Sequence, residues 1–228
     1  MIDESHRIVF FGGAGVSTES GIKDFRSEDG IYNMKFDYPP EYMLSHSFFV
    51  SHPKEFYDFY RTMMLCKGVE PNAAHYALAE LERRGKLKAV ITQNIDGLHQ
   101  KAGSKTVFEL HGSTLRNYCH RCGKSFSVDY VENNEIPYCP CGGIVKPDVV
   151  LYEEPLDGKT IENAVNAIAD ADMLIVAGTS LTVYPAAGLI DYFNGKYIVL
   201  INRDATPYDD RADLVIRDRV GETLSKVI

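Results

Sequence analysis

Short apolar runs recur along the chain and are separated by segments in which apolar residues have a helical spacing. Most of the runs are three to five residues long, and they lack the strict alternation of a half-exposed strand. Such runs are typical of strands that are buried on both faces of a parallel sheet. The pattern predicts strands at residues 8–11, 88–92, 107–110, 149–151, 173–177, 197–201 and 214–216.

Helical periodicity is clearest in two segments that lie between predicted strands. Residues 72–86 and 160–170 each place an apolar stripe on one face, and this stripe would pack on the sheet. The stripes consist of Ala74, Ala77, Leu78 and Leu81 in the first segment and of Ile161, Ala164, Val165 and Ile168 in the second. Strands that alternate with such helices predict an α/β fold with a doubly wound parallel sheet and right-handed crossovers.

Two insertions interrupt this alternation. Residues 30–71 are polar and aromatic and then form a predicted helix at 52–65, with Pro53 in its first turn. Residues 116–146 contain four cysteines and show little apolar periodicity. We expect these two insertions to form one small second domain. The large domain would consist of residues 1–29, 72–115 and 147–228.

Composition limits the partners of the protein. The 228 residues include 24 Lys and Arg against 32 Asp and Glu, which gives a net charge of −8. A chain this acidic offers no broad basic face for a nucleic-acid backbone or an anionic lipid surface. The apolar runs, such as residues 173–178, are too short to span a bilayer, and residues 1–7 lack the apolar core of a signal peptide. We therefore expect a soluble cytoplasmic protein without nucleic-acid or membrane partners.

Four of the five cysteines form two closely spaced pairs. Two residues separate Cys119 from Cys122, one residue separates Cys139 from Cys141, and 16 residues lie between the pairs. In a secreted chain such pairs would suggest disulfides, whereas in a reducing compartment they predict a tetrahedral zinc site. Because four sulfur ligands leave no position for a catalytic water, the predicted zinc is structural.

The first predicted strand leads directly into a glycine-rich turn. Residues 13–15 (Gly-Ala-Gly) match the start of a dinucleotide-binding fingerprint, but Thr18 stands where the third glycine is usual. A polar loop at residues 19–26 replaces the usual long amphipathic helix. This turn favours nucleotide binding over a simple chain reversal, and it leaves open whether NAD would serve hydride transfer or another purpose.

Polar or glycine-rich sequences follow five of the predicted strands, namely GGAGVST, QNIDGLH, HGS, GTSLTV and NRD. Each of them alone is weak evidence, since Asn, Asp and Gly are ordinary turn residues. The carboxyl ends of parallel strands share one edge of the sheet, which is where open α/β sheets bind their ligands. Together the five sequences predict a nucleotide-binding crevice.

Several motifs resemble those of the sirtuin family of NAD-dependent protein lysine deacylases. They are GAGVSTESGIKDFR, TQNIDGLHQKAG, ELHGS, the two cysteine pairs and GTSLTVYPAA, and they cover nearly the whole chain in the order of the family. The resemblance implies a Rossmann-like large domain and a zinc-bearing small domain, with NAD and acyl-lysine meeting in the cleft between them. NAD would then be a consumed co-substrate instead of a hydride carrier.

The resemblance also assigns roles to individual residues. NAD would be bound by Ala14, Gly15, Thr18, Phe25, Arg26, Gln93, Asn94, Ile95, Asp96, His111, Gly178, Thr179, Ser180, Asn202, Arg203, Arg219 and Val220. Phe25 and Arg26 would belong to a mobile loop that closes over NAD, and Asn94, Asp96 and His111 would be catalytic. Asp96 can accept a hydrogen bond from the carboxamide of nicotinamide, although a simple Asx turn is the alternative interpretation.

His111 resembles the general base of the family through its place in ELHGS. The resemblance implies that the acyl oxygen attacks the ribose as nicotinamide leaves, and that His111 then activates the ribose 2′-hydroxyl. A neutral imidazole is suited to this proton transfer. The products would be free lysine, nicotinamide and O-acetyl-ADP-ribose.

The sequence PDVVLYEE resembles the peptide-binding segment of the family, where an extended acetyl-lysine peptide pairs as an added strand. The substrate-binding residues would be Val149, Val150, Leu151 and Tyr152. The family often has Phe-Gly-Glu at the end of this segment, whereas this chain has Tyr-Glu-Glu at residues 152–154.

The helix EFYDFYRTMM bears on the acyl group that is removed. Sirtuins that prefer succinyl-lysine carry a tyrosine and, three residues later, an arginine on the matching helix. Here Tyr57 matches the tyrosine, but Tyr60 occupies the later position and Arg61 follows it. One helical residue turns a side chain by about 100°, so we expect acetyl-lysine to be favoured over succinyl-lysine.

Two other functions stay open from the sequence. Transfer of ADP-ribose to a protein, or hydrolysis of NAD, would use the same site with a different acceptor. A zinc-ribbon module for nucleic acid is the third hypothesis, and the acidic composition and the ELHGS motif count against it.

Overall fold

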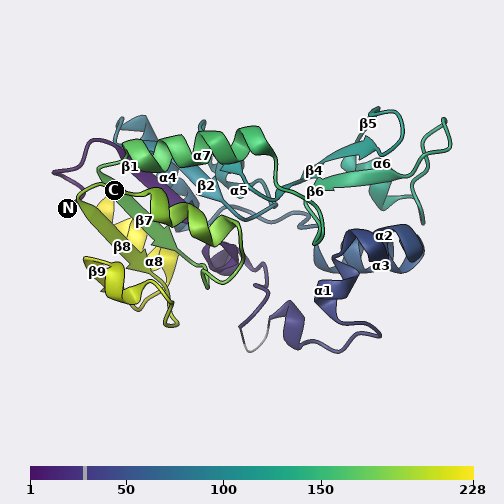
Figure 1. Ribbon diagram of the computed structural model, residues 1–228, viewed down its shortest axis with the longest axis horizontal. Helices are drawn as coiled ribbons and strands as arrows, with labels where there is room; N and C mark the ends of the chain where they lie inside the picture. The colour runs from purple at the N-terminus through teal and green to yellow at the C-terminus, as the bar shows by residue number, and fades with distance from the viewer. Residues whose placement is uncertain (28–29) are drawn as a thin grey trace.

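The computed structural model describes residues 1–27 and 30–228, which form a larger and a smaller body (Figure 1). The larger body is built on a six-stranded sheet in which every paired neighbour is parallel. In spatial order the strands are β3 (Val107–Glu109), β2 (Leu87–Thr92), β1 (Ile8–Gly12), β7 (Met173–Ala177), β8 (Tyr197–Ile201) and β9 (Leu214–Ile216). The strand order reverses between β1 and β7. The predicted doubly wound, Rossmann-like α/β sheet is therefore confirmed.

Helices cover both faces of this sheet because successive side chains of each strand point to opposite sides. Ile8 and Phe10 belong to a core cluster that includes residues of α4 (Ala73–Arg83) and α8 (Val220–Leu224). Val9 and Phe11 belong to a second cluster, with α7 (Gly158–Asp170) and the 3-10 helix η4 (Ala186–Tyr192). The helices expected at 72–86 and 160–170 are thus confirmed as α4 and α7, each packed on the sheet by its apolar stripe.

The smaller body combines helices with a three-stranded antiparallel sheet, to the right in Figure 1. Its helices are α1 (Pro40–Met43), α2 (His46–Ser51), α3 (Pro53–Met63) and α6 (Val128–Glu132). Its strands have the order β5 (Ser125–Phe126), β4 (Gly112–Cys119) and β6 (Val145–Val149). One apolar cluster joins the two inserted segments, since it holds Phe48 and Phe56 as well as Val131 and Val145. The prediction of one small helical and cysteine-bearing domain built from two insertions is confirmed.

Short elements complete the described chain. They are η1 (Ala14–Val16), η2 (Thr18–Ser20), η3 (Ile31–Asn33), α5 (Leu98–Ala102), η5 (Asp209–Arg211) and η6 (Ser225–Val227). The expected domain boundary between residues 29 and 30 touches residues 28–29, which lie outside the described residues.

The strand expected at residues 149–151 is a wrong prediction. Val149 is the last residue of β6, which pairs antiparallel with β4 and does not join the parallel sheet. The apolar run was correctly recognised as extended, but its partner β4 was not predicted, because β4 mixes Arg116 and Asn117 with its apolar residues. A run of three apolar residues does not by itself indicate which strand it pairs with.

Candidate active site

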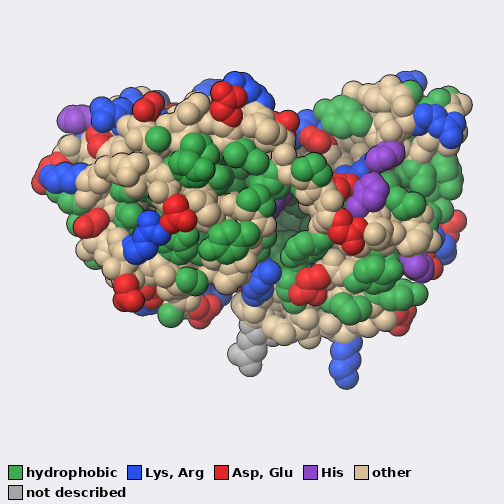
Figure 2. Space-filling view, viewed as in Figure 1, with side chains coloured by type: hydrophobic (Ala, Val, Ile, Leu, Met, Phe, Trp, Pro, Cys, Tyr) green, Lys and Arg blue, Asp and Glu red, His purple; other side chains and the backbone are tan. Residues whose placement is uncertain are grey.

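A cavity of about 610 Å³ lies between the carboxyl edge of the parallel sheet and the smaller body. Figure 2 shows the surface hollowed between the two bodies. The walls include every residue that the sequence predicts to bind NAD and all four residues expected to bind peptide. Residues that are more than 200 positions apart along the chain, such as Ala14 and Val220, therefore meet at one cleft.

The glycine-rich turn forms the floor where two loops touch. The amide of Gly15 donates a hydrogen bond of 2.8 Å to the carbonyl of Gly178. A Cβ atom on Gly15 would lie 2.7 Å from the Cα of Gly178, and Gly178 has a positive φ of 59°. The turn thus needs glycine for close backbone approach. The short helices η1 and η2 follow, and η2 ends at Gly21 (φ 87°), so no long helix opens here.

Three polar side chains form a connected network at the end of β2. Ser17 Oγ donates to Asp96 Oδ2 at 2.7 Å and accepts a hydrogen bond of 3.0 Å from Asn94 Nδ2. The other oxygen, Asp96 Oδ1, accepts a hydrogen bond from the amide of Leu98 at 2.9 Å. The Asx turn considered from the sequence is therefore present. Each carboxylate oxygen has a second lone pair, so Asp96 can also accept from a ligand amide.

The sequence did not reveal two residues of this region, one within the network and one that stabilises the glycine-rich turn. Ser17 is buried, and it follows the Gly-Ala-Gly motif closely enough to have been considered. Asn72 caps α4 by accepting a hydrogen bond from the amide of Ala74. Its Nδ2 donates to the carbonyl of Val16 and to Ser20 Oγ, which ties α4 to the glycine-rich turn. An asparagine directly before a helical pattern was the available signal for a cap.

His111 lies between β3 and β4 and faces the cavity. Its Nδ1 is 3.0 Å from the carbonyl oxygen of Gln93. Because a carbonyl only accepts, Nδ1 carries the proton in this contact and Nε2 keeps a free lone pair in the neutral ring. Burial lowers the pKa of His111, although the hydrogen bond to Gln93 opposes this change. At neutral pH the imidazole is therefore neutral and ready to accept a proton.

The side chains around Phe25 and Arg26 form the outer wall of the cleft. The Arg26 guanidinium lies over the ring of Tyr32, 5.1 Å from its centroid. The carboxylate of Asp24 caps the amides of Arg26 and Ser27 and lies 4.0 Å from Arg203 on the loop after β8. This wall is thus linked to the adenosine side of the predicted NAD site.

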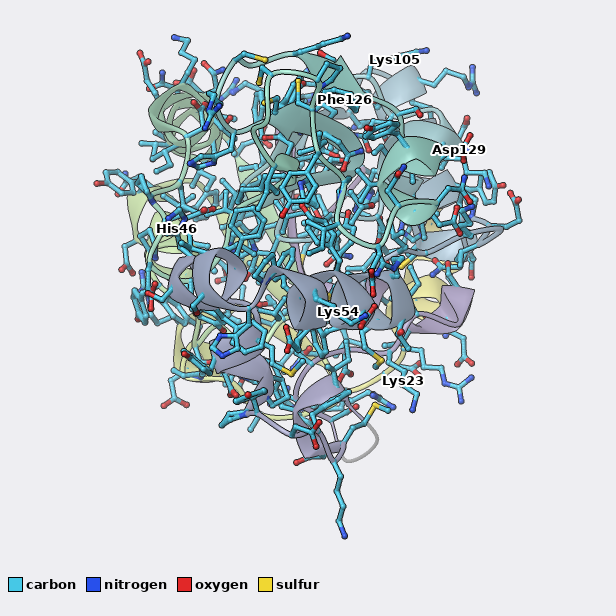
Figure 3. All side chains as sticks on the ribbon, turned by 90° about the vertical axis from the view of Figure 1, so that its right-hand side faces the viewer. Lys23, His46, Lys54, Lys105, Phe126 and Asp129 are labelled. Carbon is cyan, nitrogen blue, oxygen red and sulfur yellow. The ribbon has the colours of Figure 1, made fainter. Side chains whose placement is uncertain are left out.

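The segment after β6 runs along the opposite wall and is held at both ends. The amide of Val150 donates to the carbonyl of His111 at 3.0 Å. Tyr152 donates its amide to Leu44 and accepts a hydrogen bond from the amide of His46. Figure 3 shows His46 on α2, at the edge of the smaller body. The geometry leaves an extended segment beside the cavity, as a peptide-binding edge requires.

Glu154 stabilises this segment through its side chain. Its carboxylate accepts hydrogen bonds from Lys146 Nζ (2.9 Å), the amide of Leu151 (2.9 Å) and His46 Nδ1 (2.8 Å). Burial opposes ionisation, but these hydrogen bonds prevail and hold the pKa of Glu154 below its usual range. The neighbouring Glu153 has a positive φ of 75° and accepts from the amide and hydroxyl of Ser47. The Tyr-Glu-Glu sequence thus has a structural basis in this chain.

Helix α3 turns Arg61 away from the cavity. Arg61 donates to the carbonyl of Asn134 at 2.9 Å and pairs with Asp58. Tyr57 donates a hydrogen bond to the carbonyl of Val145. Among the described residues that line the cavity, Met63 belongs to α3 and Met64 follows the helix directly. Lys54 lies on the outward face of the helix, toward the viewer in Figure 3. Arg61, the arginine of α3, is not among the described residues that line the cavity.

The four cysteines converge, as their spacing predicts. Their sulfur atoms lie within 4.8 Å of one another, with Cys119 and Cys141 at 3.5 Å and Cys122 and Cys139 at 3.7 Å. Four ligands at about 2.3 Å from a tetrahedral zinc have sulfur atoms about 3.8 Å apart. Gly143 permits this approach, since a Cβ there would lie 2.8 Å from Cys119 Sγ. The donor set fits a structural zinc ion.

Known proteins match this chain over most of its length. The model of the Sir2 family matches residues 13–185. The chain is 64% identical to an NAD-dependent protein deacetylase of Clostridium acetobutylicum, with 100% of this chain and 95% of the relative covered. It is 57% identical to an NAD-dependent protein deacetylase of Cutibacterium acnes, with 99% and 94% covered.

Solved structures agree with the sequence matches. A Sir2 variant with a deacetylated p53 peptide and 3′-O-acetyl-ADP-ribose has a TM-score of 0.92 and 39% identity, with 99% of this chain and 94% of that chain covered. A Sir2 structure with a p53 peptide and NAD+ has a TM-score of 0.88 and 40% identity, with 99% and 93% covered. In the described part of the chain, no helix combines the length and the apolar character needed to cross a membrane.

Proposed function

Because this chain belongs to the Sir2, or sirtuin, family, we propose that it is an NAD-dependent protein lysine deacetylase. The observation that carries the proposal is the single cleft lined by His111, the Asn94–Asp96 network and the extended segment after β6. The relatives named as NAD-dependent protein deacetylases, and the solved Sir2 structures with peptide and acetyl-ADP-ribose, support the same conclusion. The reaction consumes NAD and water and yields nicotinamide, the free lysine and O-acetyl-ADP-ribose.

Asn94, Asp96 and His111 divide the chemistry between them. Asp96 accepts a hydrogen bond from the carboxamide of nicotinamide, and Asn94 lies beside it toward the ribose. The acetyl oxygen displaces nicotinamide from the ribose, and His111 Nε2 then takes the proton of the 2′-hydroxyl that attacks the acetyl carbon. The lowered pKa of His111 favours the neutral form that this step requires.

The remaining assignments follow from the lining of the cleft. The glycine-rich turn and the loops after β7 and β8 hold the phosphates and adenosine of NAD, with Phe25 and Arg26 over them. Val149, Val150, Leu151 and Tyr152 line the wall of the cleft that contacts the acetylated peptide. Zinc bound by the four cysteines orders the small domain and takes no part in the chemistry.

We extend the proposal to domain limits, location and acyl group. The large domain comprises residues 1–29, 72–115 and 147–228, so that β4 and β6 each cross the boundary between the two domains. The enzyme acts in the cytoplasm on acetylated proteins, without nucleic-acid or membrane partners. Acetyl-lysine is favoured over succinyl-lysine because Arg61 is engaged by Asn134 and Asp58, away from the cleft. Leaving a buried carboxylate without a partner costs roughly 3–5 kcal/mol.

A substitution of His111 tests the mechanism. We expect His111→Ala to fold and to bind NAD, while deacetylation falls about 10²- to 10⁴-fold, as for loss of a general base. His6→Ala is the matched control, because His6 is exposed and lies just before β1, at the edge of the sheet opposite the cleft. Deacetylation by His111→Ala at the wild-type rate would show that this histidine is structural.

A further inference from the structure

We infer that the hydrogen bond between the hydroxyls of Tyr32 and Tyr152 is a latch that couples the NAD wall of the cleft to its peptide wall. The two hydroxyl oxygens are 2.8 Å apart, although the residues are 120 positions apart in the chain. Both side chains line the same cavity. The inference rests on the proposed function, because it takes one wall to bind NAD and the other to bind peptide.

Tyr32 is fastened to the residues that face NAD. Its amide donates to the carbonyl of Phe25 at 2.9 Å, and the amide of Ile31 donates to the carbonyl of Asp24 at 2.9 Å. The rings of Phe25 and Tyr32 pack edge to face with centroids 5.5 Å apart, and the Arg26 guanidinium covers the Tyr32 ring. A displacement of the Tyr32 hydroxyl therefore moves Phe25 and Arg26 with it.

Tyr152 is fastened to the peptide wall by its own backbone. Its amide donates to Leu44 and its carbonyl accepts from His46, so the main chain is held on both sides by the segment that leads into α2. The side chain is free to reach across the cleft, and its hydroxyl has Tyr32 as its partner. Tyr152 is 39% exposed, which places the latch at the mouth of the cavity.

The bond depends on the hydroxyl of Tyr152. Phenylalanine at this position would lack the oxygen and could not make the bond. Burial, together with the hydrogen bond to Tyr152, raises the pKa of Tyr32. The Tyr32 phenol therefore stays protonated through the physiological pH range. Tyr152 is a positioning residue that acts on NAD through Tyr32.

The latch predicts a defined effect of removing one oxygen. A neutral hydrogen bond of this kind changes an equilibrium constant by about two- to tenfold. We expect Tyr152→Phe and Tyr32→Phe each to weaken NAD binding by about that factor, because Phe25 and Arg26 are no longer held over the site. The double variant should bind NAD no more weakly than either single variant, since all three lack the same bond.

The test combines calorimetric titration of NAD into the peptide-free protein with limited trypsin digestion. Tyr76→Phe is the control, because Tyr76 is half exposed on α4 and its ring does not line the cavity. Both latch variants should lose NAD affinity and be cleaved faster after Arg26, while melting temperatures stay close to that of the control. A purely structural tyrosine would lower the melting temperature without changing NAD affinity.

The outcomes separate the latch from the proposed function. The latch alone would be overturned if the wild-type protein binds NAD and deacetylates a peptide while the latch variants keep the same NAD affinity and the same rate of trypsin cleavage. Additive effects in the double variant would also overturn it, because two separate contacts would then be involved. Wild-type protein that neither binds NAD nor deacetylates would instead overturn the proposed function.

Discussion

The parallel sheet and the cysteine module, which we define as residues 112–149, reach their folded state by different means. Every residue of β1 and β7 is buried, and two apolar clusters enclose the sheet on both faces. In the cysteine module the residues at 120–125 are all exposed, and two cysteines are among the few buried side chains. The sheet is stabilised by apolar burial, whereas we propose that the module depends on a zinc ion bound by its four cysteines. The predictions below test this contrast.

Loss of one zinc ligand should have the largest effect. Because structural zinc supplies roughly 10 kcal/mol or more, we expect Cys119→Ser to unfold the cysteine module and abolish deacetylation. Hydrogen exchange followed by mass spectrometry should show lost protection in β4 and β6 and retained protection in β1 and β7. Cys66→Ser is the control, because Cys66 lies outside the cluster. An active Cys119→Ser protein, or active wild-type protein without zinc, would refute the structural role of the metal.

A cavity in the parallel sheet should show the opposite pattern. Ile175 on β7 is 1% exposed. We expect Ile175→Ala to lower the free energy of unfolding by about 2–5 kcal/mol while one zinc per chain is retained. Leu214→Ala on the edge strand β9, where Leu214 is 40% exposed, should cost much less. Urea denaturation and metal analysis of both variants test this prediction. Loss of zinc from Ile175→Ala would show that the sheet and the cysteine module are not stabilised independently.

The smallest effect concerns two buried histidines beneath the cleft. The rings of His75 and His99 are 4.7 Å apart, and among the described residues neither nitrogen of His99 has a hydrogen-bond partner. Burial lowers the pKa of His75 to about 4 and that of His99 to about 3, with Asp96 as the nearby opposing charge for His75. In the unfolded chain both would have a pKa of about 6.5.

These shifts make the fold sensitive to acid. Above about pH 7.5 almost no histidine is protonated in either state, and their contribution to stability is complete. As the pH falls toward 4, the unfolded chain binds protons that the folded chain does not, so stability falls by about 1.4 kcal/mol per pH unit for each histidine. His99→Leu should reduce the change in the free energy of unfolding per pH unit by the contribution of about one histidine. Urea titrations at pH 7.5, 6 and 5 measure this change. A slope equal to that of the wild type would refute the assignment.

The contrast between the two regions also explains what could be predicted from the sequence. The strands and helices of the parallel sheet were found because their apolar runs and stripes face a core on one or both sides. The convergence of the four cysteines was predicted because their spacing is itself the signal. The strand β4 was missed because its Arg116 and Leu115 are exposed and its order depends on pairing with β6.

The candidate site likewise contains residues that the sequence predicts and contacts that it does not predict. Residues inside recognisable motifs, such as Asp96 and His111, were predicted, and the structure brings them to one cleft. The contacts that order the walls of the cleft were not predicted, because Ser17, Asn72 and the Tyr32 hydroxyl act on partners that are distant in sequence. Motifs mark residues that contact a ligand, whereas tertiary packing decides which residues position them.

The most direct test of the account is the product balance of one reaction. Purified zinc-loaded protein would be incubated with NAD and an acetyl-lysine peptide, and the products would be quantified by mass spectrometry. We predict equal amounts of nicotinamide, deacetylated peptide and O-acetyl-ADP-ribose, with much slower turnover of the same peptide when it is succinylated. Nicotinamide released with free ADP-ribose or an ADP-ribosylated protein, while the peptide stays acetylated, would contradict the proposed deacetylase.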